Sequence, residues 1–459
     1  MIRNSPTAAT HRRPKKAALA ALLAAALLAA GWWAWSGRAA PVQRPLEVII
    51  SGDTAGWIVP CGCTSNQSGG LPRRGTLAAQ TGQGADLLLL DAGGAARGTS
   101  PYDVARFSAI LRGERLMGIH AHNIGAAEAE LGTETLSRLR TETGVPLFST
   151  NATDATGRGV GEPALVVSAG GHRVAVLGVL SPALAPSGWR VTSPQTAVPQ
   201  ALADLRGKYD VAIVLAYLPD EELQRLAAEL PEVDIVAGGP TGQSISPRQL
   251  GPTMLVSATN KGKFVARLSA SRGGAGWSGQ IVELNASFAD DPRQQENVQA
   301  FRRELADRDF AASETSFIDP LSASAETEQS LAGSARCIEC HSDCAAAWQG
   351  SGHAHAGASL QDSAADSQCQ QCHTDGYGLP GGFVSARRSA NLALVGCESC
   401  HGPSAQHAAQ PKQPTAYVGR APDQCLRCHD SENSPAFSYA QYWPRIEHTL
   451  EAAPSEPVP

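Results

Sequence analysis

Hydrophobic residues follow two contrasting patterns along this chain. From 46 to 290, short aliphatic runs alternate with amphipathic stretches, which is typical of buried strands connected by helices. From 335 to 450, regular apolar periodicity almost disappears. The pattern therefore predicts a layered α/β region, followed by a region whose core is not built from aliphatic side chains alone.

The expected elements of the first region can be read from these runs. The predicted strands are Leu46–Ser51, Ala85–Asp91, Val145–Ser149, Arg173–Val179, Asp210–Ala216, Val233–Ala237 and Met254–Ser257. The predicted helices are Val104–Met117, Thr133–Thr143 and Asp220–Leu230. Two late β segments, Lys263–Ser271 and Gly279–Asn285, are expected to close the region as a meander.

The remaining segments flank these two regions. A basic segment, 1–16, precedes an uncharged stretch, 17–36, which ends in three tryptophans and predicts a transmembrane helix or signal-anchor. A cleaved signal peptide is the alternative. Composition further predicts a linker at 37–45, a linking helix and connector at 291–334, and a disordered tail at 451–459.

Four copies of Cys-x-x-Cys-His lie in the last third of the chain. They are Cys337, Cys340 and His341; Cys369, Cys372 and His373; Cys397, Cys400 and His401; and Cys425, Cys428 and His429. In this pattern the two thiols form thioethers with the heme vinyl groups, and the histidine binds the iron. Zinc ribbons also use paired Cys-x-x-Cys, but zinc does not need a histidine after every second cysteine. The motifs therefore predict four covalently bound heme c groups, which would also supply the missing core of the region 335–450.

Covalent heme limits the compartments in which the protein can be assembled, and the net charge limits its partners. Heme attachment to this motif takes place outside the bacterial cytoplasm, so we expect a protein on the periplasmic side of the inner membrane, anchored there, or free in the periplasm if the signal is cleaved. The net charge of −6 argues against nucleic-acid binding. The cysteines outside the motifs, Cys61, Cys63 and Cys344, could be buried thiols, a disulfide, a redox pair or a soft-metal site.

The region from Cys337 to about His448 resembles a known family. The stretches CQQCHTDGYGLPGGF, LVGCESCHGP and AAAWQGSGHAHA are similar to the tetraheme cytochrome c that accepts electrons from hydroxylamine oxidoreductase. This resemblance implies three hemes with two histidine ligands and one five-coordinate heme.

The same resemblance assigns the second histidine ligands. It gives His407 to the first heme, His353 to the third and His448 to the fourth, and leaves the second heme with His373 alone. His355 would either be a surface residue or cap that open iron.

The first region resembles the calcineurin-like metallophosphoesterases of the periplasmic 5'-nucleotidase type. The matching stretches are VIISGDTAGWIVPCGCTSNQSGGLPRR, LLLLDAGG, NIGAAEAELG and VDIVAGGPTG. The family holds two metal ions, and this chain keeps only Asp53 and Asp91 clearly among the expected ligands. The positions where other ligands are expected hold Ala55, Gly94, Ala126, Ala127, Tyr217 and Pro240. The resemblance therefore implies a metallo-dependent phosphatase-like fold without activity, unless His120 and His122 form a rearranged site.

The sequence as a whole predicts a tetraheme c-type cytochrome that transfers electrons between redox partner proteins, or a quinone-linked oxidoreductase, and another acceptor. We expect an electron-transfer protein rather than an enzyme. Two alternatives stay open: an oxidoreductase that binds a small nitrogen oxide at a five-coordinate second heme, and an active phosphoesterase fused to a cytochrome.

Overall fold

The computed structural model describes residues 1, 44–60, 67–271, 276–317, 330–417 and 422–448. The chain divides into a unit Met1–Arg44 and a unit Pro45–Pro459, and every element below belongs to the second unit. The predicted anchor 17–36, Cys61, Cys63 and the tail 451–459 lie outside the described residues. Within those residues, the model contains no helix with the length and apolar character needed to cross a membrane.

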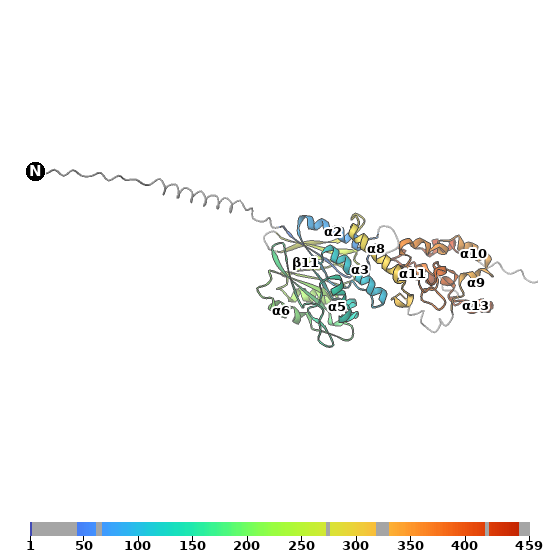
Figure 1. Ribbon diagram of the computed structural model, residues 1–459, viewed down its shortest axis with the longest axis horizontal. Helices are drawn as coiled ribbons and strands as arrows, with labels where there is room; N and C mark the ends of the chain where they lie inside the picture. The colour runs from blue at the N-terminus through green and yellow to red at the C-terminus, as the bar shows by residue number, and fades with distance from the viewer. Residues whose placement is uncertain (2–43, 61–66, 272–275, 318–329, 418–421, 449–459) are drawn as a thin grey trace, which may run out of the picture. The chain divides into compact units, whose positions relative to one another are not determined.

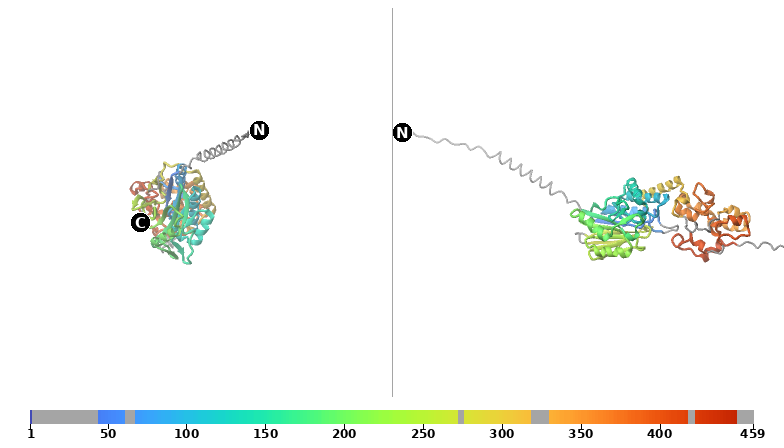
Figure 2. Two further views of the ribbon diagram at one scale, coloured as in Figure 1. Left: turned by 90° about the vertical axis from the view of Figure 1, so that its left-hand side faces the viewer. Right: turned by 90° about the horizontal axis from the view of Figure 1, so that it is seen from below.

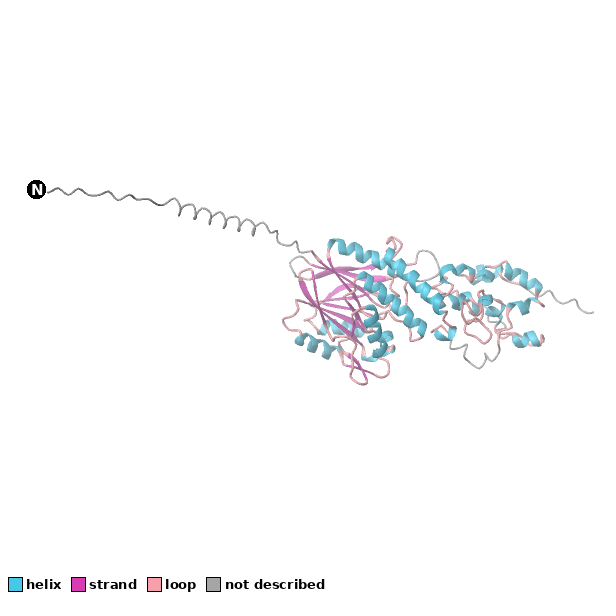
Figure 3. Ribbon diagram, viewed as in Figure 1, coloured by secondary structure: helices cyan, strands magenta, loops and turns pink. Residues whose placement is uncertain are grey.

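Two six-stranded mixed sheets form the centre of the α/β region (Figure 3). The first has the order β14 (Trp277–Glu283), β13 (Phe264–Ala270), β1 (Leu46–Ser51), β2 (Asp86–Asp91), β3 (Ala121–Asn123), β4 (Leu147–Phe148). The second has the order β11 (Ile245–Leu250), β12 (Thr253–Ser257), β10 (Ile235–Gly239), β9 (Val211–Tyr217), β7 (His172–Leu180), β6 (Leu165–Ala169). A small antiparallel pair is formed by β5 (Ala152–Asp154) and β8 (Trp189–Val191).

The two sheets pack face to face because their strands are apolar on both sides. In β1, Val48 and Ile50 join a cluster shared with side chains of the second sheet, whereas Ile49 points to the helices. This alternation follows from the period of two along a strand. Each aliphatic side chain buried in this way contributes about 1.5–3 kcal/mol to folding.

Helices cover the two outer faces and complete four layers (Figures 1 and 2). The first sheet is covered by α2 (Leu71–Gly84), α3 (Pro101–Met117), α5 (Gly132–Thr143) and α8 (Pro292–Arg308), with the short α4 (Ala126–Glu130) between β3 and α5. The second is covered by α6 (Pro194–Asp204) and α7 (Asp220–Glu229). The predicted α/β layered sandwich is therefore confirmed, and the helix predicted as a link packs, as α8, onto α2 and α3.

The region from residue 330 onward consists of short helices and loops (Figure 3). The helices are α9 (Ser334–Ile338), α10 (Ser342–Gln349), α11 (Ser367–His373), α12 (Cys397–His401), α13 (Ala405–Ala409), α14 (Asp423–Leu426) and α15 (Tyr439–Tyr442). Short 3-10 segments lie between them at Gly352–His355, Ala358–Ser363 and Ala390–Leu392. Another, Trp443–Arg445, follows α15, and two more, Pro182–Leu184 and Ala312–Glu314, lie earlier in the chain. In α11 and α12 the whole motif lies on one helix, which places both cysteines and the histidine on one face because residues three and four apart are neighbours.

Candidate heme sites and the degenerate metal site

A large cavity lies at the centre of the region that carries the motifs. Its volume is about 1510 Å³, and all four motif histidines line it. Every motif cysteine lines it as well, except Cys340, which is exposed. Cys344, whose role the sequence left open, also faces this cavity.

Three of the motif histidines face a second histidine across the cavity. The ring centres are 6.1 Å apart for His341 and His407, 6.1 Å for His353 and His429, and 6.0 Å for His401 and His448. An imidazole nitrogen binds a metal at about 2 Å, and the ring centre lies about 1 Å beyond it, so two rings on opposite sides of one ion have centres about 6 Å apart. The three pairs therefore have the spacing that one iron between two imidazoles requires.

Hydrogen bonds to the other ring nitrogen support the same interpretation. His373 Nδ1 lies 2.8 Å from the Ala356 carbonyl oxygen. His407 Nδ1 lies 2.6 Å from the carbonyl oxygen of Gln413, and His448 Nδ1 lies 2.8 Å from that of Ile446. A carbonyl oxygen only accepts, so Nδ1 carries the proton and Nε2 keeps a free lone pair. Metal-binding histidines in proteins show this arrangement almost always.

Electrostatics keep two further histidines in the form that binds a metal. Burial lowers the pKa of His353, and His429 beside it lowers it further. Burial likewise lowers the pKa of His429. A neutral imidazole is the form that coordinates iron, so these environments fit ligands of a heme.

The pairing corrects one expectation and agrees with another. His407 faces His341 of the first motif, as the resemblance implied. His353, however, faces His429 of the fourth motif, and His448 faces His401 of the third, so the two assignments are exchanged. Sequence order does not determine the pairing, because it depends on how the loops around Gly352–His355 and Trp443–Arg445 fold back over the motifs.

The second motif differs from the other three. Within the described residues, no second histidine ring is paired with His373. His355 is exposed and does not line the cavity, so it does not cap this position. His353, two residues earlier in the same 3-10 turn, points into the cavity instead.

Contacts between motifs show which of them are neighbours. Cys397 raises the pKa of the Cys337 thiol and Cys337 lowers the pKa of Cys397, which shows that the first and third motifs are neighbours. The thiol of Cys428 is hydrogen-bonded to that of Cys372, which brings the fourth and second together. Cys400 interacts with Cys425 and Cys428, which connects the third motif to the fourth.

The edge of the first sheet holds the residues that the phosphoesterase resemblance identified. Asp53 follows β1 and accepts hydrogen bonds from the Thr259 hydroxyl and the Asn260 N–H. The ring of Tyr217 fills the space beside it: a Cβ atom added to Gly94 would lie 2.7 Å from the Tyr217 ring, and one added to Gly125 would lie 2.9 Å from it. Tyr217 thus occupies the place into which a side chain at Gly94 would project.

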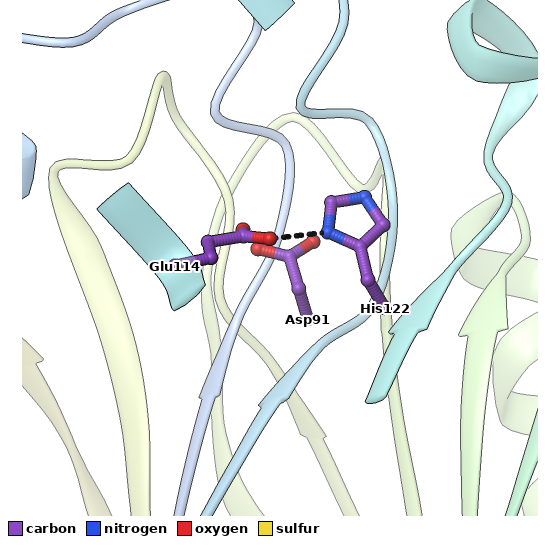
Figure 4. A group of neighbouring side chains, drawn as sticks. All are labelled: Asp91, Glu114 and His122. Atoms are coloured by element: carbon purple, nitrogen blue, oxygen red, sulfur yellow. Dashed lines mark hydrogen bonds and ion pairs between the residues drawn. The ribbon is translucent and has the colours of Figure 1, made fainter. Parts of the chain in front are cut away.

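A buried group of charged residues lies behind this edge (Figure 4). Asp91, Glu114 and His122 offer ligand atoms within 4.8 Å of one another, and all three are buried. His122 Nδ1 lies 2.8 Å from Glu114 Oε2, and Arg74 Nη1 lies 3.4 Å from Asp91 Oδ2. His120 lies outside this group, and its Nδ1 accepts a hydrogen bond of 3.2 Å from the Leu89 N–H.

Arg74 and His122 offset the carboxylates of Asp91 and Glu114 without a metal ion. Burial alone would lower the pKa of His122, but the carboxylates of Glu114 and Asp91 raise it well above its usual value. His122 is therefore a cation, with Glu128 3.8 Å from its Nε2. Glu128 also accepts hydrogen bonds from the backbone N–H groups of Gly94, Ala95, Ala96 and Gly125. Arg74 and His122 supply the positive charge that metal ions would bring, so this donor set fits a salt-bridge network better than a metal centre.

Several residues of the α/β region that the sequence did not single out also line the heme cavity. They are Trp57, Ile58, Val59, Pro60, Arg97, Arg106, Lys261, Val298, Phe301 and Arg302. Lys261 forms an ion pair with Glu432, near the fourth motif, and its ammonium group lies 5.6 Å from the Trp57 ring centre. No sequence motif marks these residues, because their role depends on contacts with distant parts of the chain, as between Lys261 and Glu432.

Comparison with known proteins agrees with the motif region. Residues 336–402 match the family described as "Cytochrome c554 and c-prime". Cytochrome c-554 of Nitrosomonas europaea is 35% identical over 88 residues, which cover 16% of this chain and 37% of that protein. The chain thus spans little more than a third of the length of this curated relative.

Comparison of structures agrees with the fold of the α/β region. A 5'-nucleotidase precursor from Thermus thermophilus has a TM-score of 0.51 and 21% identity, covering 57% of this chain and 59% of that chain. The sulfate thiohydrolase SoxB of the same species has a TM-score of 0.49 and 17% identity, covering 59% and 63%. Both resemblances found in the sequence are therefore confirmed: the segment 336–402 matches the cytochrome c554 and c-prime family, and the α/β region before it has the fold of the 5'-nucleotidase precursor.

Proposed function

We propose that this protein is a tetraheme c-type cytochrome that carries electrons between redox partners. One observation carries the proposal, namely the three histidine pairs whose ring centres lie 6.0–6.1 Å apart inside one cavity. The cysteines beside them support covalent heme at these places, and the match of residues 336–402 supports it for the first three motifs.

Each part of the motif region has a distinct task in this proposal. The thiols Cys337, Cys340, Cys369, Cys372, Cys397, Cys400, Cys425 and Cys428 attach the cofactor. The pairs His341–His407, His401–His448 and His353–His429 would each supply two ligands to an iron, and His373 would supply one. When bound, heme c supplies an iron that cycles between the ferric and ferrous states.

The contacts between motifs suggest a path through the protein. The first motif touches the third, the third touches the fourth, and the fourth touches the second. Electrons would therefore enter or leave beside His341 or beside His373, because these motifs form the two ends of the series.

The α/β region acts as a scaffold in this proposal and not as a phosphoesterase. Tyr217 fills the space next to Gly94, and Arg74 and His122 neutralise the remaining carboxylates. The loop after β12, which holds Asp53 through Thr259, also carries Lys261 and its ion pair with Glu432. The former metal edge thus serves as a contact surface for the motif region.

We further propose that the protein works on the periplasmic side of the inner membrane, attached through the segment 17–36. The basic residues before this segment and its uncharged composition support the anchor. The partners would be redox proteins or a quinone-linked oxidoreductase on one side and another acceptor on the other.

The proposal is tested by counting hemes and determining their spin states in the oxidised full-length protein. We expect four hemes per chain in the pyridine hemochrome assay. Electron paramagnetic resonance (EPR) should show low-spin signals from three hemes and a high-spin signal from one. A count below four would refute the tetraheme proposal, and zinc in place of iron would refute covalent heme altogether.

A second candidate function follows from the unpaired His373. A coordination position without a protein ligand could bind a small nitrogen oxide, and the protein would then act as an oxidoreductase at the second motif. Nitric oxide added to the oxidised protein separates the two functions. A changed high-spin signal would favour this candidate, whereas an unchanged spectrum would favour electron relay alone.

A further inference from the structure

Arg106 is a buried cation whose surroundings in the described structure do not satisfy it. Its residue is 4% exposed, and neither Nε nor Nη1 has a hydrogen-bond acceptor among the described residues. The nearest carboxylate oxygen is Asp366 Oδ2, 3.9 Å from Nη2, which is beyond hydrogen-bond length.

Asp366 compensates this guanidinium only in part, because its Oδ2 stays 3.9 Å away and its Oδ1 is bonded elsewhere. Its Oδ1 accepts a hydrogen bond of 2.5 Å from the Tyr102 hydroxyl and one of 3.0 Å from the Gln368 N–H at the start of α11. The Tyr102 ring lies 5.4 Å from the Arg106 guanidinium, but a ring face offers no acceptor for the N–H groups. Burying a charged group without hydrogen bonds is costly, so a missing acceptor is expected at this place.

A second guanidinium faces the same cavity. Arg97 and Arg106 both line it, and the Arg97 guanidinium lies 5.1 Å from the Phe317 ring centre. Burial lowers the pKa of Arg97, and the positive charge of Arg106 lowers it further. Two positive charges therefore meet at this cavity wall, one on the buried Arg106 and one on the exposed Arg97, which favours negative charge in the cavity contents there.

The second motif lies next to these two arginines. Asp366 is the N-cap residue of α11, which carries Cys369, Cys372 and His373. Arg106 and Tyr102 both lie near Cys369. The acceptor that Arg106 lacks is therefore expected on the group attached at this motif.

We propose that Arg106, with Arg97 beside it, binds the propionate carboxylates of the heme attached at Cys369 and Cys372. The propionates, on the ring edge opposite the two thioethers, are the anionic groups of heme c, and they are the acceptors that a guanidinium on the cavity wall would meet. The planar fork of a guanidinium matches a carboxylate with two parallel hydrogen bonds. The α/β region then does more than support the motif region, because its helix α3 sets the charge around one particular iron.

The inference rests on the proposed function, because it needs a heme at the second motif. It predicts that a positive charge beside the propionate favours the ferrous state of that heme. Removing the charge should lower the reduction potential of one heme and leave the other three unchanged.

The experiment is a potentiometric titration of the full-length, heme-loaded protein followed by EPR, with R106Q, R106K and R97Q compared with wild type. In R106Q, we expect the ferric-to-ferrous ratio of the high-spin heme to rise about tenfold at a fixed potential, which is about 59 mV for one electron. R97Q should raise the same ratio by a smaller factor. R106K should leave the reduction potential of this heme close to the wild-type value. The resonance Raman band of propionate bending should move in R106Q and R106K, because both lose the bidentate hydrogen bonds.

R112Q is the matched control. Arg112 is on the same helix, pairs with Glu304 Oε2 at 3.1 Å and does not line the cavity, so its loss should leave every potential unchanged. The proposal is overturned if R106Q and R97Q change the reduction potential of no heme by more than R112Q does, even if R106Q unfolds at a lower temperature. If R106Q loads no heme, R106K and R97Q decide by the Raman band and the potential. A heme count below four in the wild type would refute the proposed function instead.

Discussion

At the scale of single residues, His353 and His355 show how much depends on two positions in one turn. Both belong to the 3-10 turn Gly352–His355, yet only His353 faces another histidine, His429. The resemblance identified His353 as an iron ligand, and the count of histidines supported it. The choice of partner could not be predicted, because it depends on the path of the chain between residues 355 and 429.

We expect His353→Ala to remove one iron ligand and His355→Ala to remove none. In the first variant, one low-spin EPR signal should become high-spin, because an alanine cannot coordinate. His355→Ala is the matched control from the same turn and should have the wild-type spectrum. An identical spectrum in both variants would contradict the pairing.

The low-spin signals should also identify the first motif. The ring planes of His341 and His407 make an angle of 18°, whereas the ring planes of the other two pairs make angles of 49° and 55°. Nearly parallel imidazoles give the more rhombic low-spin spectrum, so His407→Ala should abolish the most rhombic signal. Loss of a less rhombic signal instead would show that the ring orientations differ from those described here.

The buried pair of His122 and Glu114 makes stability depend on pH. Burial alone would lower the pKa of His122, but the carboxylates of Glu114 and Asp91 raise it well above the unfolded value of about 6.5. Its stabilising contribution is fully present below the unfolded pKa and is lost as pH rises through the folded pKa. Each tenfold gain in proton affinity on folding corresponds to about 1.4 kcal/mol. Burial raises the pKa of Glu114 as well, which acts in the same direction.

We therefore expect the urea midpoint of the full-length protein to fall as pH rises above 7. In Glu114→Gln, His122 loses its main partner, and this slope should flatten. His120→Gln is the control: burial lowers the pKa of His120, so this histidine is already neutral above pH 7. Equal slopes in the wild type and Glu114→Gln would show that His122 is not the group that titrates.

At the scale of elements, the predictions succeeded where runs were apolar and failed where polar residues interrupt them. The predicted strand Leu46–Ser51 is β1, and the predicted segment Val145–Ser149 contains β4 (Leu147–Phe148). Helix α6 was not among the predicted helices; it has Pro194 in its first turn, where proline is tolerated, and Pro199 in its interior. Strand β11 was missed because its sequence ISPRQL contains a proline and polar residues, as an edge strand tolerates.

The packing of the two sheets predicts how substitutions at their interface behave. Ile213 on β9 is fully buried between the sheets, so Ile213→Ala should lower the free energy of unfolding by about 2–5 kcal/mol. Val166 on the edge strand β6 is 42% exposed. Val166→Ala should therefore change the free energy of unfolding by less than about 0.5 kcal/mol. Urea unfolding of both variants measures the difference, and similar values would argue against a core between the sheets.

At the scale of the whole molecule, the motif region could be predicted in far more detail than its contacts with the α/β region. The spacing within each motif reflects the fixed geometry of one cofactor, so it is readable from the sequence alone. The role of Arg106 or Lys261 is not readable in this way, because each becomes significant only through residues more than 150 positions away. The sequence also indicated the loss of metal ligands, but not that Tyr217 fills the space they left.

This filled site leads to the prediction that the protein has no phosphoesterase activity. A Cβ at Gly94 would lie 2.7 Å from the Tyr217 ring, so the missing ligand cannot simply return, and Arg74 competes with any cation for Asp91. With manganese added, hydrolysis of a nucleotide or a generic phosphodiester should not exceed the rate in buffer. Asp53→Ala and Asp91→Ala should give the same rate as the wild type. Turnover that disappears in both variants would instead show that two carboxylates suffice for a metal site, and the α/β region would then be an enzyme coupled to the hemes.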